Sequence, residues 1–151
     1  MSKDFGAAIV CADTETTYRY GAVCEIAVID ACTGTTLLDT PVNPGIPITP
    51  DAQAVHGISD DDVAAEGVPD WKTIYPKVFR VTKDRIVLAY KADYDQTVIV
   101  GDCADANHWA DVMIPRANHA RSPRWLPNGG GHRSLGDAQE TPRHLQRMTA
   151  P

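Results

Sequence analysis

The sequence lacks any long hydrophobic run, and no apolar stretch approaches the roughly 20 residues that a helix needs to cross a bilayer. Its first six residues carry mixed charge and show none of the apolar region and cleavage site of a secretory signal. The few cysteines are scattered, without a C-x-x-C pair or zinc-finger histidines, which argues against disulfides and structural zinc: Cys11, Cys24, Cys32 and Cys103. We therefore expect a cytoplasmic protein that makes no membrane contact.

Glycine, proline and polar repeats are not in excess, so nothing in the composition predicts disorder. The 151 residues, 43% hydrophobic and 23% charged, are enough for one substantial core and too few for two ordinary ones. We predict a single domain over residues 1–151, with its core at about 7–148.

Positive charge is scarce over most of the chain. The net charge is −6, but residues 112–151 hold six arginines and two acids, a local net of +4, which leaves −10 for residues 1–111. This distribution argues against broad wrapping of duplex DNA, which requires many phosphate contacts. It is compatible with a pocket that holds one or two nucleotides through metal ions, because carboxylates are then the ligands.

The first part of the chain has the pattern of an antiparallel meander. Three apolar, β-branched segments read as strands, with a turn at Thr33-Gly34 before the third: Ala7–Asp13, Ala22–Asp30 and Thr35–Val42. The proline-punctuated segment Asn43–Gly57 then reads as a loop.

Helices and strands alternate in the rest of the chain. We predict helices after the Ser59 N-cap and at Pro69–Val81, Ala92–Asp102 and His132–Met148, strands at Arg85–Tyr90 and Trp109–Ile114, and a loop at Asn118–Pro127. Pro142 should kink or break the last helix, because proline lacks the N–H and clashes with the preceding turn. The order predicts an α/β fold with a mixed five-stranded sheet flanked by helices.

Asp13 and Glu15 are the first residues with a chemical implication. In an extended strand, residues two apart project on one face, so both carboxylates can reach one point. Their repulsion is relieved when cations bind between them. Considered alone, the pair is also compatible with a solvated strand end.

Six segments in order resemble the motifs of the DnaQ-like (RNase T) superfamily of 3′–5′ exonucleases, in the form called DEDDh. Residues Ile9–Thr17, followed by Glu25–Asp30, are similar to the first motif of the family. Val42–Gly45 and Ile48–Ile58 resemble the loop that the family places over the terminal nucleotide. Ala89–Asp95 is similar to the second motif, and Gly131–Ala138 matches the third in its H-x-x-x-x-D form. Each motif alone is weak evidence for the family. Their combination is strong evidence, because it spans nearly the whole chain in the family's order.

The resemblance implies an RNase H-like fold and an assignment of residues. Two Mg²⁺ or Mn²⁺ ions would be bound by four carboxylates, those of Asp13, Glu15, Asp95 and Asp137, and would hold the scissile phosphate between them. His132 would be the general base, since a neutral imidazole accepts a proton near pH 7. The residues implied in substrate binding are Thr16, Asp51 and His56.

Some of these residues also have ordinary structural explanations. Asp95 is an acid in a first helical turn, which the helix dipole favours, and Asp51 and His56 could be plain loop residues. His132 could cap a helix; its five-residue separation from Asp137 would place the two about 140° apart on one helix. We therefore expect His132 on the loop after Gly129–Gly131.

The sequence also departs from the family pattern. Tyr18 follows Thr17 where Gly-Leu is usual, and Tyr90-Lys91 stand in place of His-Asn, with Lys91 adding a positive charge beside the metal site. The segment between Asp102 and Gly129 is short, and a last helix distorted at Pro142 would misplace Asp137, so a catalytically weak nucleic-acid-binding or polymerase-associated module is the alternative interpretation. The favoured one is an exonuclease that releases 5′-mononucleotides from a 3′ end, with single-stranded DNA as the expected substrate, in DNA replication or repair, alone or with a DNA polymerase in trans.

Overall fold

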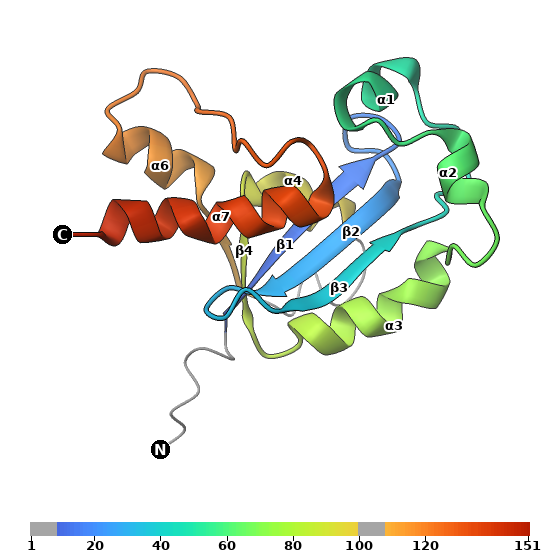
Figure 1. The fold of residues 1–151 in the computed structure, drawn as a ribbon, viewed down its shortest axis with the longest axis horizontal. Helices are drawn as coiled ribbons and strands as arrows, with labels where there is room; N and C mark the ends of the chain where they lie inside the picture. Colours follow the sequence, from blue (N-terminus) through green and yellow to red (C-terminus); the bar gives the residue numbers. More distant parts are fainter. Residues whose placement is uncertain (1–8, 100–107) are drawn as a thin grey trace.

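The computed structural model describes residues 9–99 and 108–151, which form a mixed five-stranded sheet in the order β3-β2-β1-β4-β5 (Figure 1). β1 (Ile9–Thr16), β2 (Val23–Asp30) and β3 (Thr36–Pro41) are the antiparallel meander. β4 (Ile86–Ala89) and β5 (His108–Asp111) run parallel to β1. The predicted fold class is confirmed.

Helices cover both faces of this sheet. α3 (Trp71–Thr82) and α4 (Ala92–Val98) pack on one face, where Ile74, Val78 and Val98 join the larger apolar cluster with strand residues such as Val10 and Val28. α7 (Ser134–Thr149) crosses the other face, with Ala138 in a second cluster. The apolar side chains alternate along the strands between the two clusters, because successive strand residues point to opposite faces.

The segment predicted as a loop at Asn43–Gly57 contains a helix, α1 (Pro50–His56). The Thr49 side chain accepts a hydrogen bond from the Ala52 N–H, and Gly57 ends the helix with a φ of 76°. Threonine before proline and an acid is a helix start signal, so the sequence contained the information. α2 (Asp60–Ala64) begins at the predicted cap, Ser59, with a capping box.

The prediction of a strand over Trp109–Ile114 is wrong beyond Asp111. β5 ends there, and α6 (Met113–His119) follows, overlapping the start of the predicted loop Asn118–Pro127. The Asp111 carboxylate explains the change of direction, because it accepts hydrogen bonds from the backbone N–H groups of Ala92 and Ile114. One acid at a strand end therefore orients the starts of both α4 and α6.

The expected break at Pro142 is also wrong. α7 continues through this residue from Ser134 to Thr149, and Pro142 is buried against the rest of the protein. Packing of the helix on β1 and β2 outweighs the loss of one helical hydrogen bond. The predicted helix Ala92–Asp102 is present to Val98, and its part from residue 100 onward lies outside the described residues, as do residues 7 and 8 of the first strand.

Within residues 9–99 and 108–151, no helix has the length and apolar character needed to span a membrane.

Candidate active site

The site is built where the carboxyl ends of the parallel strands meet. Asp13 and Glu15 lie on β1 on the same face as Cys11, which packs in the cluster beneath α7. From α7, Asp137 reaches the same point. The three carboxylates offer ligand atoms that all lie within 4.8 Å of one another. Strand alternation places Asp13 and Glu15 on one face, as predicted. The path of α7 brings Asp137, 122 residues after Glu15, to the same point.

Asp95 approaches from the opposite face of the sheet. It lies in the first turn of α4 and is 2% exposed, and its Oδ1 accepts hydrogen bonds from the Thr14 N–H (3.0 Å) and hydroxyl (2.7 Å). Its charge helps to raise the pKa of Asp13, so the two carboxylates are close neighbours. Asp95 is not part of the three-carboxylate group, and its role as a fourth ligand stays a prediction.

The glycine loop before α7 packs directly on Asp137. A Cβ added at Gly130 would lie 2.5 Å from the Asp137 Cα and N, and one added at Gly136 would collide with the Gly130 carbonyl. Only hydrogen fits at these two positions, so the loop and the first turn of α7 form one tightly packed unit.

His132 lies in this loop, as predicted, rather than in the helix. Its φ is 55°, its side chain is exposed, and α7 begins two residues later. Burial raises the pKa of the Asp137 carboxyl, and His132 is close enough to oppose part of that rise. The position allows His132 to act beside the carboxylates without belonging to the helix.

An ion pair that the sequence reasoning did not single out ties β2 to this loop. Glu25, directly opposite Glu15 in the β1–β2 register, is 5% exposed. It accepts hydrogen bonds from the Arg133 guanidinium (Nε 3.1 and 3.0 Å) and from the Ser134 N–H (2.7 Å). The bonds between Glu25 and residues more than a hundred positions away hold the start of α7 over the sheet.

Without a cation, the carboxylates are in an unfavourable environment. Burial, with a contribution from neighbouring acids, raises the pKa of Glu15 to about 9 and that of Asp13 well above its usual value. Burial also raises the pKa of Asp95 to about 7, against the hydrogen bonds from Thr14. For Asp137, burial raises the pKa, while His132 and the backbone N–H groups of His132 and Gly130 act in the other direction.

These residues fit a divalent metal ion. The Asp13 Oδ2 is buried and has no hydrogen-bond partner, although buried carboxylate oxygens are nearly always paired. It lies in the group of three convergent carboxylates, which is the oxygen-ligand set that Mg²⁺ and Mn²⁺ prefer. A cation would satisfy this oxygen and remove the repulsion.

We expect the metal-free protein to lose stability as the pH rises. The Glu15 carboxyl keeps its proton to about pH 9 when folded but only to about 4.5 when unfolded, so the folded state holds more protons between these values and its stability falls through this window. Denaturant unfolding in EDTA at several pH values measures the effect.

Two controls belong to this measurement. Mg²⁺ should reduce the pH dependence, since it takes the place of the proton, and Glu15→Gln should flatten it in EDTA. A free energy of unfolding that rises between pH 5 and 9 in EDTA would contradict the pKa shifts.

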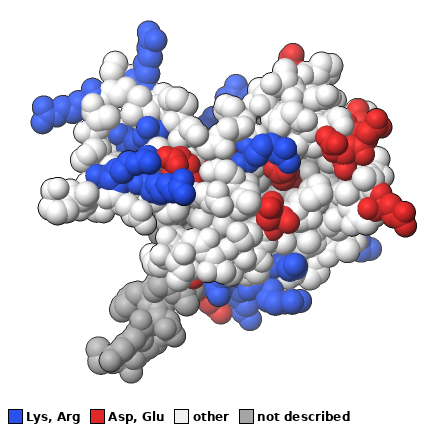
Figure 2. Space-filling model, viewed as in Figure 1, with Lys and Arg blue, Asp and Glu red and all other residues white. Residues whose placement is uncertain are grey.

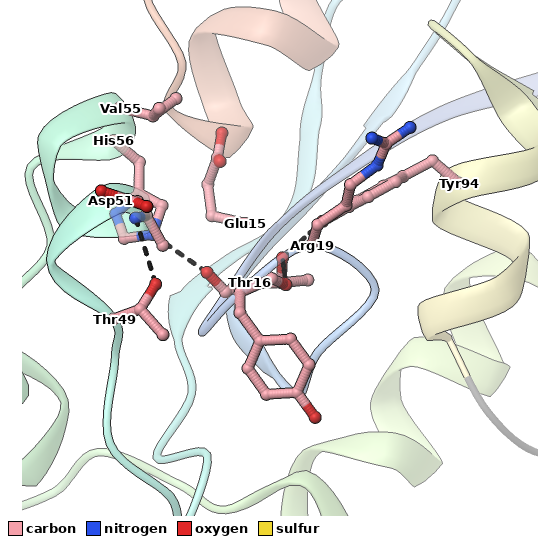
Figure 3. Close-up of a pocket in the computed structure, with 10 residues that line it drawn as sticks. Glu15, Thr16, Arg19, Thr49, Asp51, Val55, His56 and Tyr94 are labelled. Atoms are coloured by element: carbon pink, nitrogen blue, oxygen red, sulfur yellow. Dashed lines mark hydrogen bonds between the residues drawn. The ribbon is translucent and has the colours of Figure 1, made fainter.

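A pocket of about 470 Å³ opens beside the carboxylates. Figure 3 shows Asp51 and His56 of α1 on one side, Arg19 and Tyr94 on the other, and Glu15 between them. The volume lies in the usual range for small-ligand sites, about 300–1,000 Å³. Glu15, one of the three convergent carboxylates, therefore also lines a cavity large enough for a small organic ligand.

The three residues predicted to bind substrate all line this pocket. Asp51 is exposed on α1. The Thr16 hydroxyl donates to the Tyr18 carbonyl (2.8 Å) and accepts from the Tyr94 hydroxyl.

His56 is buried, and both of its ring nitrogens are engaged. Its Nδ1 accepts from the Ile58 N–H, which leaves Nε2 to donate to the Thr16 carbonyl. The histidine therefore fastens α1 to the end of β1 (Figure 3). Contact between any of these three residues and a nucleotide stays a prediction.

Comparison with known proteins gives consistent matches. The family model RNase_T, described as "Exonuclease", matches residues 10–144. An "Uncharacterized exonuclease CP81" of Escherichia phage 186 is 38% identical over 89 residues, which are 58% of this chain and 44% of the phage protein. The chain thus spans less than half the length of this curated relative.

Solved structures share the fold. "Exonuclease X in complex with 5' overhanging duplex DNA" has a TM-score of 0.70 at 24% identity, covering 93% of this chain and 90% of that one. The Neurospora crassa Pan2 catalytic unit, with its protease and nuclease domain, has a TM-score of 0.70 at 17% identity, over 97% of this chain and 28% of that one. A full-length 3'-exonuclease has a TM-score of 0.66 at 16% identity, over 98% and 62%.

Proposed function

This chain belongs to the RNase T exonuclease family, and we propose that it is a metal-dependent 3′–5′ exonuclease that releases 5′-mononucleotides from single-stranded DNA. The observation that carries the proposal is the convergence of Asp13, Glu15 and Asp137, with the unpaired Asp13 oxygen among them. The adjoining pocket supports a substrate whose terminal nucleotide is enclosed there.

Two Mg²⁺ or Mn²⁺ ions are the proposed cofactors, held by these three carboxylates with Asp95 beside them. When bound, such ions polarise the scissile phosphate and stabilise charge on the leaving oxygen. The protein's own contribution is to keep the carboxylates in place: β1 fixes two of them, and the Glu25–Arg133 ion pair fixes the start of the helix that carries the third.

His132 is the proposed proton acceptor. Its neutral imidazole takes a proton from the attacking water, whose oxygen bonds to phosphorus while the bond from phosphorus to the 3′ oxygen breaks. The products are a 5′-mononucleotide and a strand shortened by one residue with a new 3′ hydroxyl. The loop position of His132 supports this role, because the side chain is exposed next to Asp137 rather than enclosed in the helix.

The pocket is the proposed binding place of the terminal nucleotide. Thr16 and Asp51 offer polar groups toward it, and α1 forms one wall. A terminal nucleotide held against this wall would favour action at a strand end.

We expect hydrolysis to require a free 3′ end. With Mg²⁺, a 5′-labelled linear single-stranded oligonucleotide should give a ladder that shortens one nucleotide at a time, with 5′-mononucleotides as the other product. A circular single strand of the same sequence should be cut at least about tenfold more slowly, and EDTA should stop both reactions. Efficient cutting of the circle would exclude the exonuclease proposal, and parallel DNA and RNA substrates decide between the two polymers.

The alternative, a catalytically weak nucleic-acid-binding or polymerase-associated module, has less support. Its basis was a distorted last helix that would misplace Asp137, yet α7 runs unbroken through Pro142. All five positions that the chemistry requires are filled by the expected residue types. An association with a DNA polymerase in trans, and a role in replication or repair, remain part of the proposal.

A further inference from the structure

Large aromatic side chains are unusually exposed on the side of the pocket formed by Tyr94. Trp125 is 63% exposed and Tyr20 is 41% exposed. Exposed apolar surface of this kind, when it is grouped, marks interaction sites. Neither residue has a role in the hydrolysis proposed above.

These rings form one continuous series with two cations. The Tyr20 and Tyr94 rings lie 4.8 Å apart between centroids, and the Arg19 guanidinium is 5.7 Å from the Tyr20 ring. Lys91 links the other end, because its Nζ lies 5.9 Å from the ring centroids of both Tyr94 and Trp125. We call these five residues the aromatic–cation surface.

The exposed tryptophan is held on a fixed backbone. The Tyr90 hydroxyl donates to the carbonyl of Leu126, the next residue, and Arg116 donates to the Pro127 carbonyl (2.5 Å) and to the Tyr90 hydroxyl (3.1 Å). On the other side, the Ser122 hydroxyl donates to the Arg124 carbonyl (2.6 Å). An exposed indole on an anchored backbone is available to contact something outside the chain.

The surface is continuous with the active site. Tyr94 lines the pocket, its hydroxyl bonds Thr16, and the next residue is Asp95. A strand whose last nucleotide occupies the pocket would meet Tyr94, Lys91 and Trp125 as it leaves.

The charges near the surface are complementary to a polyanion. Residues 120–128, which present Trp125, contain two arginines and no acid. Figure 2 shows Lys and Arg over the α6 and α7 side of the molecule as well as along its lower edge, whereas Asp and Glu are concentrated at the end opposite α6, where α2 contributes Asp60–Asp62. Aromatic faces with interleaved cations suit single-stranded nucleic acid, whose bases stack on rings while its phosphates meet the cations.

We propose that the aromatic–cation surface binds the single-stranded nucleotides that precede the 3′-terminal one, with a base on Trp125 and phosphates at Lys91 and Arg19. This proposal adds a substrate-binding surface to the proposed exonuclease and rests on that function. The surface sets affinity for longer strands without taking part in bond cleavage. Lys91, which departs from the family pattern, thereby has a place in substrate binding.

The test compares chain lengths. Single-turnover hydrolysis and equilibrium binding in EDTA are measured with oligothymidylates of 2 to 10 nucleotides. Trp125→Ala should weaken binding of the 10-nucleotide strand about tenfold, since stacking on one aromatic ring contributes about 1–3 kcal/mol per base. It should leave hydrolysis of the dinucleotide unchanged, and Trp125→Phe, which keeps a stacking face, should restore most of the affinity.

A matched pair of lysine variants tests the charge. Lys91→Asn, which tolerates the positive φ of 65° at this position, should weaken binding and reduce its salt dependence, whereas Lys77→Gln, at an exposed position of α3, should do neither. Equal losses for both variants would overturn the proposal.

The outcomes separate this proposal from the proposed function. If the parent hydrolyses no oligonucleotide, the exonuclease function fails. If the parent is active but Trp125→Ala binds strands of every length as the parent does, the aromatic–cation surface is not a nucleic-acid site. A dimer of the parent that Trp125→Ala dissociates in sedimentation would instead assign the surface to a second copy of this chain and overturn the proposal.

Discussion

Replacing Asp13 with asparagine is expected to abolish hydrolysis while the protein remains folded. The substitution keeps the shape of the side chain but removes the buried charge whose Oδ2 has no partner within the described part of the chain. Metal-assisted charge stabilisation contributes several kcal/mol, so the loss should reach at least about 10³-fold. Asp13 gains nothing from its acidic neighbours except repulsion, and the metal-free variant should therefore be more stable than the parent.

The measurement combines activity, unfolding and metal binding. Asp13→Asn should lose activity and Mg²⁺-dependent stabilisation together, and it should unfold at higher denaturant concentration than the parent in EDTA. Asp61→Asn, an exposed acid on α2, is the control and should change none of these quantities. A variant that is unfolded, or one that retains the parental rate, would remove Asp13 from the metal site.

His132→Ala is expected to slow the chemical step by about 10²–10⁴-fold with little change in metal affinity, the usual contribution of a positioned general base. A capping role would instead predict lost stability. The structure argues against capping by His132, since Arg133 occupies the N-cap of α7 and the Glu25 carboxylate accepts the hydrogen bond from the first helical N–H, that of Ser134. Unfolding of the variant should therefore match that of the parent.

The pH dependence of the single-turnover rate separates base catalysis from other effects. At saturating Mg²⁺, the parental rate should rise with pH as the imidazole loses its proton and then flatten, because only the neutral ring accepts a proton. His132→Ala should lose this rise, and the exposed His119 of α6 offers the control, since His119→Ala should retain it. An unchanged profile with a small rate loss would show that His132 does not act as the base.

The local features of the site were predictable from sequence because they depend on local geometry. Strand alternation is enough to place Asp13 and Glu15 on one face, and the glycines before α7 are enough to place His132 outside the helix. α1 could have been predicted from its cap residues, yet the prolines around Thr49 favoured a loop. Local signals of opposite meaning cannot be weighed without knowing what the segment packs against.

Other features depend on contacts between distant residues. The pairing of Glu25 with Arg133 requires the β1–β2 register and the path of α7 over it, and neither is encoded near either residue. Pro142 stays in a continuous helix because the surrounding protein buries it, a tertiary effect that helix propensity does not include. Both the ion pair and the unbroken helix therefore depend on packing between elements that are distant in the sequence.

The contact between Gly130 and Asp137 constrains how this sequence can change. Even a single methyl group at residue 130 or 136 would push the histidine loop away from the helix. The separation of His132 from Asp137 is therefore set by two residues that carry no side chain, and a substitution at either glycine would alter that separation without removing the histidine or the carboxylate.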